Sequence, residues 1–271
     1  MGRYIRTVVA LTTLVLVAGC DSRGTFSHVP WHPDTWSYHK AEDQPIVLEV
    51  ARPVAIDVES FNGDVIITAD DQLTNATVSI LREATHGYRR KEEAQASLAE
   101  IDYSLALVPG EFGQVLQVRT WTTHAEPHFQ RAHILIDVPE VDGITVRAQR
   151  GNVFVTNIEG PVDISTSQGN VRLMTNLPMR RAVTITIRQG NIDYRVRGES
   201  SGALDCQAIR GRVDHRVMTG RLIIEPDRDK GRLRATLNDG DNPITLRTAD
   251  GDIRIAVVDN PTEVGWLIVE P

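Results

Sequence analysis

Apolar and polar residues alternate in short phrases along the second half of the chain, and a glycine opens each phrase. After Pro139, glycines recur about every ten residues, and every second one begins GNVFV, GNVRL, GNIDY, GRVDH, GRLRA or GDIRI. These phrases start at Gly151, Gly169, Gly190, Gly211, Gly231 and Gly251. A repeat of about 20 residues with two glycine turns has room for two short strands but not for two helices. The pattern predicts an all-β fold, a β-solenoid with two strands in each coil.

The register of the phrases separates a buried column from an exposed one. Successive side chains of a strand point to opposite faces, and the second residue after each glycine is always a branched aliphatic one. One coil cannot cover its own apolar column, so we expect the coils to stack about 4.8 Å apart. The buried column is Val153, Val171, Ile192, Val213, Leu233 and Ile253. The next column is Phe154, Arg172, Asp193, Asp214, Arg234 and Arg254, whose charged members form a candidate surface ladder.

Two residues in the inward columns carry reactive groups. Cys206 shares a column with Ile185 and Leu246 and is interpreted as a small core residue, not a reactive thiol. His215 also falls at an inward position and is expected to be partly buried. A structural histidine with a backbone partner and a catalytic one both remain possible there. A second ladder is expected at the corners, where the side chains after the glycines are Asn152, Asn170, Asn191 and Asp252.

Residues 46–138 are predicted to form a separate N-terminal β region with one helix. Alternation favours strands within 47–59, 65–67, 77–81, 114–122 and 131–138. The segment near 88–101 is rich in helix formers and places Ala94, Leu98 and Ile101 on one face, so we expect a helix lying on a sheet. The solenoid would then occupy residues 139–271.

The N-terminus has the pattern of a secretory signal, assigned to residues 1–19. Arg3 and Arg6 precede a largely apolar stretch that is too short to span a bilayer. The ending Ala18-Gly19-Cys20 resembles the lipobox of bacterial lipoproteins, which implies that Cys20 is acylated, for example with palmitate, and anchors the chain in a membrane. An ordinary secretory peptide cleaved near Gly19 is the alternative. Residues 20–45 contain three prolines and no sustained period, and are interpreted as a flexible tether.

Charge separates the two halves of the mature chain. Residues 20–138 hold 9 basic and 18 acidic groups, whereas residues 139–271 hold 18 of each, and 17 of those basic groups are arginines. A formal charge of -7 for the whole chain argues against a nucleic-acid partner, because phosphate binding needs a basic surface. Only Cys206 remains as a thiol after lipidation, so no disulfide is expected within the chain.

Histidines and carboxylates offer weak metal patterns. His28, His32 and His39 lie in the tether, and His124, His128 and His133 follow an H-x3-H-x4-H spacing. The first set does not have the spacing of a rigid site. In the second, His133 is expected to point outward from its strand, and nothing holds the loop that carries the other two. The corner residues lack the acidic group in every coil that a calcium stack needs. We therefore expect no metal and no cofactor.

The phrases also carry a family resemblance. The run VPEVDGITVRAQRGNVFVTNIEGPVDISTSQGNVRL, the G-N/D-V/I phrases and the earlier SFNGDVIIT are similar to the bacterial β-strand-repeat family of unknown function, often labelled putative adhesin and related to head domains of putative autotransporter adhesins. The resemblance covers residues 46–271. It implies a β-solenoid in a cell-envelope protein and brings no catalytic residues.

Three functions are compatible with these patterns. The first is a non-enzymatic scaffold, adhesin or sensor, anchored by its lipid and facing the periplasm or exterior, that presents its surface to an envelope protein or polysaccharide. The second is a carbohydrate-active β-helix enzyme, which would use Asp193 and Asp214 flanked by Arg172 and Arg234. The third is a regulatory lipoprotein, which no residue distinguishes from the first.

Overall fold

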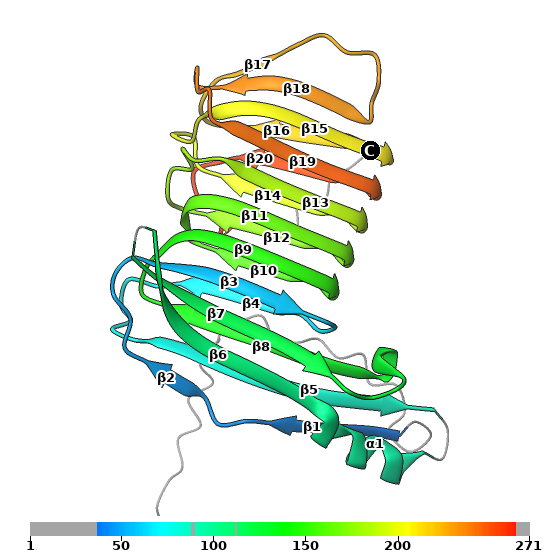
Figure 1. Ribbon diagram of the computed structural model, residues 1–271. Helices are drawn as coiled ribbons and strands as arrows, with labels where there is room; N and C mark the ends of the chain where they lie inside the picture. The colour runs from blue at the N-terminus through cyan, green and yellow to red at the C-terminus, as the bar shows by residue number, and fades with distance from the viewer. Residues whose placement is uncertain (1–36, 88–89, 112, 264–271) are drawn as a thin grey trace, which may run out of the picture. The chain divides into compact units, whose positions relative to one another are not determined.

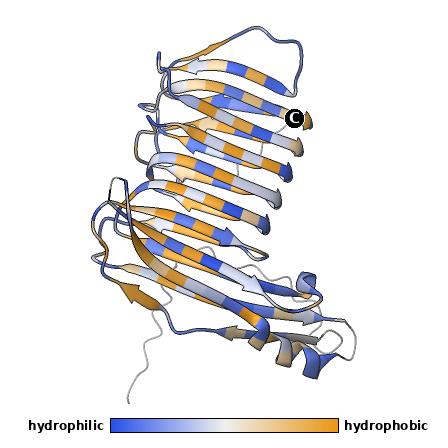
Figure 2. Ribbon diagram, in the orientation of Figure 1, coloured by the Kyte–Doolittle hydropathy of each residue, from blue (hydrophilic) through white to orange (hydrophobic). Residues whose placement is uncertain are grey.

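The computed structural model describes residues 37–87, 90–111 and 113–263, and most of these residues lie in two β-sheets. Figure 1 shows the strands of each sheet stacked one above another, with one sheet behind the other. Hydrophobic and hydrophilic residues alternate along many of the strands (Figure 2). The fold is therefore all-β, and the aliphatic face of each sheet packs into a core between the two.

Sheet A contains ten strands, nine of which follow one another across the sheet while β2 pairs with β5 near one end. In spatial order they are β1 Ser37–Glu42, β5 Ala76–His86, β8 Gln130–Val138, β4 Val65–Ala69, β10 Val153–Thr156, β12 Val171–Thr175, β14 Ile192–Val196, β20 Ile253–Val257 and β16 Val213–Val217, with β2 at Ile46–Leu48.

Sheet B also contains ten strands. In spatial order they are β17 Leu222–Ile224, β18 Arg232–Leu237, β15 Gly202–Arg210, β19 Pro243–Asp250, β13 Val183–Gln189, β11 Glu159–Gln168, β9 Val141–Arg150, β3 Val54–Ser60, β7 Gly113–Thr122 and β6 Ile101–Gly110. One short helix, α1 Lys91–Ser97, and two 3-10 turns at Leu98–Glu100 and Pro127–Phe129 complete the described elements.

Parallel pairs form the middle of each sheet, and antiparallel pairs close both ends of sheet B but only one end of sheet A. In sheet A, the pairs from β8 through β4 to β16 are parallel, whereas β5 pairs antiparallel with β8 and β1. In sheet B, the parallel run from β7 to β15 ends in the antiparallel pairs β6–β7 and β15–β18. Strands from residues 46–138 and 139–271 thus share both sheets.

The stacking order differs from the order of the phrases in the sequence. The inward column of sheet A runs through Val153, Val171 and Ile192 as expected, but the next member is Ile253, and Val213 comes last. In sheet A, β20 therefore lies between β14 and β16, and in sheet B, β19 lies between β13 and β15.

Composition explains why the last phrase takes an interior place. β20 presents Ile253, Ile255 and Val257 inward, all at most 3% exposed. β16 has His215 at the matching position, opposite Ile255, and a histidine buried in an aliphatic column would need a polar partner. β16 therefore forms the edge of sheet A, and His215 is exposed there. The expectation that His215 is partly buried was wrong.

Leu233 is the other correction to the predicted column. It lies on β18 of sheet B, opposite Cys206 in an antiparallel pair, and not in sheet A. The polar segment before it turns the chain back, with the Asp229 carboxylate accepting the Gly231 N–H at 2.9 Å. Because β18 runs antiparallel to β15, the phrase GRLRA adds no coil of its own.

The corner glycines record the same order independently. A Cβ built on Gly169 would lie 1.9 Å from the Gly151 carbonyl oxygen, and one on Gly190 would lie 1.9 Å from that of Gly169. A Cβ on Gly251 would meet the oxygen of Gly190, and one on Gly211 would meet that of Gly251. Only glycine allows corner backbones to approach this closely, and several of them also have positive φ angles.

The side chains after these glycines form a continuous amide ladder. The Asn152 Oδ1 atom accepts the Asn170 backbone N–H at 3.0 Å, and Asn170 Oδ1 accepts that of Asn191 at 3.0 Å. Asp252 continues the ladder by donating its N–H to Asn191 Oδ1, and its own carboxylate accepts the N–H of Arg212. At the other end, Asp64 accepts from Asn152. The ladder thus provides hydrogen-bond acceptors for corner N–H groups that are not bonded by strand pairing.

The N-terminal region has more strand than expected. Residues Ser37–Glu42, assigned to the tether, form β1 and pair with β5. The helix predicted near 88–101 is shorter than expected, because α1 ends at Ser97. Ile101 is the first residue of β6, and its side chain is buried. α1 contacts β1 and β5, and so lies at the end of sheet A.

Candidate binding groove

The structure brings together four members of the proposed surface ladder. On adjacent strands of sheet A the outward positions read Arg172, Asp193, Arg254 and Asp214, so the charge alternates along the row. Arg234 is not among them. It lies on β18 of sheet B, opposite Asp205. Alternation of this kind stabilises cross-strand pairs, at about 0.2–1 kcal/mol each, and needs no ligand.

The two carboxylates suggested for an enzyme are not neighbours. Arg254 of β20 lies between Asp193 and Asp214, because β20 separates β14 from β16. The Asp193 carboxylate is bound by the Nε of Arg172 at 3.2 Å and by Arg195 at 2.7 Å. The pair of carboxylates with flanking arginines, as read from the sequence, is therefore not formed.

Cys206 lies in the core, where its side chain is fully buried. Burial, together with the neighbouring Asp205 carboxylate, raises the pKa of the Cys206 thiol to about 12. A thiol with such a pKa is a poor nucleophile at neutral pH, which agrees with its interpretation as a packing residue.

The three histidines of the H-x3-H-x4-H pattern do not form one cluster. His128 is exposed and packs on Phe129, with ring centroids 4.1 Å apart. His133 is 3% exposed and lies 3.3 Å from the Glu83 carboxylate and 3.6 Å from that of Asp64. Burial opposes protonation, yet these two carboxylates raise the pKa of His133 to about 9. His124 lies elsewhere, edge-on to His86.

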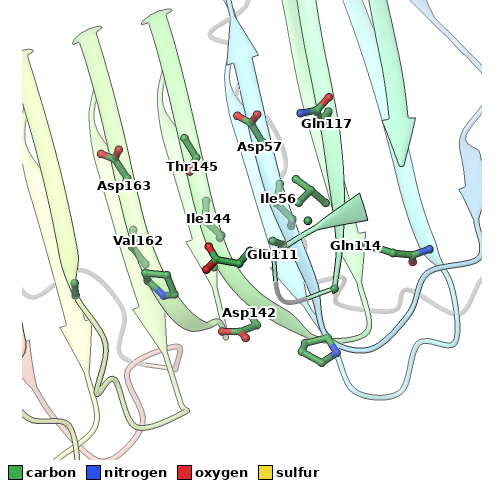
Figure 3. Close-up of a pocket in the computed structure, with 18 of the residues that line it drawn as sticks. Ile56, Asp57, Glu111, Gln114, Gln117, Asp142, Ile144, Thr145, Val162 and Asp163 are labelled. Carbon is green, nitrogen blue, oxygen red and sulfur yellow. The ribbon is translucent and has the colours of Figure 1, made fainter. Parts of the chain in front are cut away.

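A groove lies on the outer face of sheet B. It has a volume of about 670 Å³ and is lined by β3, β7, β9, β11 and β13, together with the turn between β6 and β7. Figure 3 shows Asp57, Thr145 and Asp163 side by side on neighbouring strands, with Glu111 of the turn over Ile144. We call this site the sheet B groove.

The sheet B groove is acidic. Four carboxylates line it, those of Asp57, Glu111, Asp142 and Asp163, and the only charged group of opposite sign in its lining is Arg147. Asp57 is paired with Arg119 and lies 3.7 Å from Arg147. Within residues 37–87, 90–111 and 113–263, no cation lies within ion-pair distance of the other three carboxylates, so the groove carries a net negative charge.

Sequence reasoning missed the sheet B groove, although part of the signal was present. The excess of acidic over basic residues in 20–138 indicated a negative surface but not its position. Asp142 and Asp163 come from the electrically balanced half, and they reach the groove only because β9 pairs with β3 and β11 pairs with β9. The turn that covers one side belongs to β6, a strand that the alternation did not predict.

Comparison with known families matches the middle and the later part of the chain. Residues 132–256 match the family described as Toastrack DUF4097. This Toastrack segment begins within β8 and ends within β20. It supplies β9, β11 and β13 of the sheet B groove, whereas β3, β6 and β7 precede it. No curated protein matches the chain.

Two solved structures resemble the chain. A crystal structure described as a putative cell adhesion protein from Clostridium sporogenes has a TM-score of 0.53 at 11% identity, and the alignment covers 80% of this chain and 99% of that one. A second, described as a putative adhesin from Bacteroides fragilis, has a TM-score of 0.30 at 11% identity over 82% and 97% of the two chains. At such identities the first similarity supports a shared fold.

The proposed lipid site and the helix search concern different residues. Cys20, the signal segment and most of the tether lie outside the described residues. Among the residues that are described, no helix has the length and apolar character needed to span a bilayer.

Proposed function

We propose that this chain is a lipid-anchored protein of the bacterial cell envelope that binds a positively charged protein segment in the sheet B groove and catalyses no reaction. The net negative lining of the groove is the observation that carries the proposal. The structural relative described as a putative cell adhesion protein supports a binding role, and the resemblance of Ala18-Gly19-Cys20 to a lipobox supports the anchor.

Charge selects the kind of partner. Carboxylates on a concave surface attract lysine and arginine side chains and repel anionic polysaccharides or nucleic acids. The groove runs across several strands of sheet B, so an extended segment fits it better than a compact ligand. Its outward row contains Asp57, Thr145, Asp163 and Thr184, and the threonine hydroxyls can donate to or accept from a bound backbone.

Site-specific photocrosslinking in intact cells tests the groove. A photoreactive residue at Thr184, in the lining, is expected to capture a partner that the same residue at Gln189, exposed on the same strand outside the lining, does not. Changing both Asp142 and Asp163 to Asn should reduce the yield at Thr184 several-fold, and added salt should have the same effect. Equal capture at both positions, or a yield indifferent to the two substitutions, would contradict the proposal.

Membrane fractionation tests the anchor separately. The Cys20→Ser variant has no thiol to acylate, so we expect it in the soluble fraction, whereas the parent chain stays with membranes. The Cys206→Ser variant is the matched control, because its thiol is buried in the core and should not affect partitioning. If Cys20→Ser protein remained membrane-bound, the lipid anchor would be refuted while the sheet B groove stood.

A further inference from the structure

Three side chains with metal-binding atoms meet at the α1 end of sheet A, away from the sheet B groove. They are His86 at the end of β5, Glu93 in the first turn of α1 and His124 in the segment after β7, and their ligand atoms all lie within 4.8 Å of one another. Three different elements thus converge on one point. The sequence pattern had grouped His124 with His128 and His133 instead.

His86 is the central residue of this cluster. Its side chain is fully buried, and its Nε2 atom lies 2.9 Å from the Ser97 hydroxyl. That hydroxyl donates its own proton to the Ala94 carbonyl at 3.0 Å, so it accepts from His86, and the ring carries its proton on Nε2. Nδ1 is left as a lone pair, and it is buried without a hydrogen-bond partner. It lies 3.9 Å from a Glu93 carboxylate oxygen.

A buried nitrogen lone pair that accepts no hydrogen bond costs free energy, and a bound ligand would remove that cost. We propose that His86, Glu93 and His124 bind a divalent transition-metal ion of the zinc type. Two histidines and one glutamate are a familiar zinc donor set, with a fourth position left for water. The Ser97 hydroxyl would then act as the outer partner that fixes the tautomer and orientation of a ligating histidine.

The surroundings are consistent with a neutral, accessible ligand set. Burial, and then the nearby Arg90 guanidinium, lower the pKa of His86, so that its ring is neutral at pH 7 as a metal requires. Phe129 stacks on His86 with ring centroids 5.1 Å apart and shields one side. Glu93 is 46% exposed, which leaves a path for the ion from solvent.

Two contacts are expected to change when the ion binds. The first is the ion pair between Arg90 and Glu93, which is lost when the Glu93 carboxylate turns to the metal. Arg90 keeps its second partner, the Glu126 carboxylate at 2.7 Å. The Glu126 N–H donates to Nδ1 of His124 at 3.0 Å, so coordination through Nε2 requires that ring to move its proton to Nδ1 and release this bond. The distances between the three ligand atoms then shorten to about 3.3 Å, which is the ligand-to-ligand distance in a tetrahedral zinc site.

Cobalt titration provides the test, because Co²⁺ in a tetrahedral site absorbs visible light and Zn²⁺ displaces it. The protein used is the full chain with Cys20→Ser, and with His28 and His32 changed to Gln so that histidines outside the described residues do not bind. We expect one Co²⁺ per chain and a rise in Tm with Zn²⁺. Glu93→Gln should weaken binding at least tenfold, and Ser97→Ala by about tenfold through loss of the outer partner.

His128→Ala is the matched control, since His128 is exposed nearby but belongs to no cluster, and it should bind as the parent does. His86→Ala should abolish binding. Because that substitution opens a buried site, the exposed Glu93→Gln keeps the test valid if His86→Ala fails to fold. Absence of a visible band in the parent, or equal affinity in the parent and in Glu93→Gln, would overturn the metal site and leave the sheet B groove unaffected.

Discussion

The Gly169→Ala variant is expected to lose a large part of its free energy of unfolding. A Cβ at this corner would lie 1.9 Å from the carbonyl oxygen of Gly151, and the backbone φ angle of +134° is one that residues with side chains rarely adopt. Neither atom can move alone, because the Gly169 N–H also bonds to Gln189 of the next coil. The expected cost is roughly 4–5 kcal/mol or more, a large share of the 5–15 kcal/mol that typically holds a domain together.

Urea unfolding followed by circular dichroism measures this loss against a matched glycine. Gly87→Ala adds the same methyl group where no atom lies within 4 Å of the new Cβ, so its stability should stay close to that of the parent. A Gly169→Ala protein as stable as Gly87→Ala would mean that the corner backbones are not stacked in contact.

Local patterns predicted the parts of the fold that depend on a single strand. The aliphatic position after each corner glycine correctly marked Val153, Val171 and Ile192 as core, because alternation directly reports which face of a strand is buried. The asparagine ladder was also foreseeable, since each rung repeats the same residue at the same corner.

The order of the strands could not be obtained in this way. Ile253 and Val213 have the same local pattern, and only the competition between their phrases for an interior place separates them. The deciding residue is His215, whose cost of burial is a property of the whole stack and not of one phrase. The surface ladder failed at Arg234 for a related reason, because its strand reversed direction after a polar turn.

The two candidate sites illustrate the same limit. The sheet B groove joins Asp57 to Asp163 through β9, which pairs with β3 on one side and with β11 on the other, and the metal cluster joins β5 to the segment after β7. Histidine spacing suggested a set around His124, but the neighbour it actually has is His86, which no short-range motif connects to it.

Leu246→Ala is expected to destabilise the protein far more than Ile224→Ala. If the coils were stacked in sequence order, Leu246 would belong to the terminal coil and Ile224 to an interior one. In the structure β19 lies between β13 and β15, and Leu246 is fully buried, whereas Ile224 lies on the edge strand β17 and is 42% exposed. Truncating a buried leucine costs about 2–5 kcal/mol, and an exposed edge substitution about 0.5 kcal/mol.

Urea unfolding of both variants, with native-state hydrogen exchange on the parent, separates the two orders. Amide protons of β19 and β20 should exchange among the slowest, because both strands have hydrogen-bonded neighbours on each side, and those of β16 and β17 should exchange faster. The reverse ranking, with Ile224→Ala the costlier change and β19 exchanging early, would be inconsistent with an inserted C-terminal coil. A terminal coil can unfold locally, whereas an inserted coil can open only when the stack around it opens. Urea unfolding and hydrogen exchange are therefore both expected to identify the β19–β20 coil as more stable than β16 and β17.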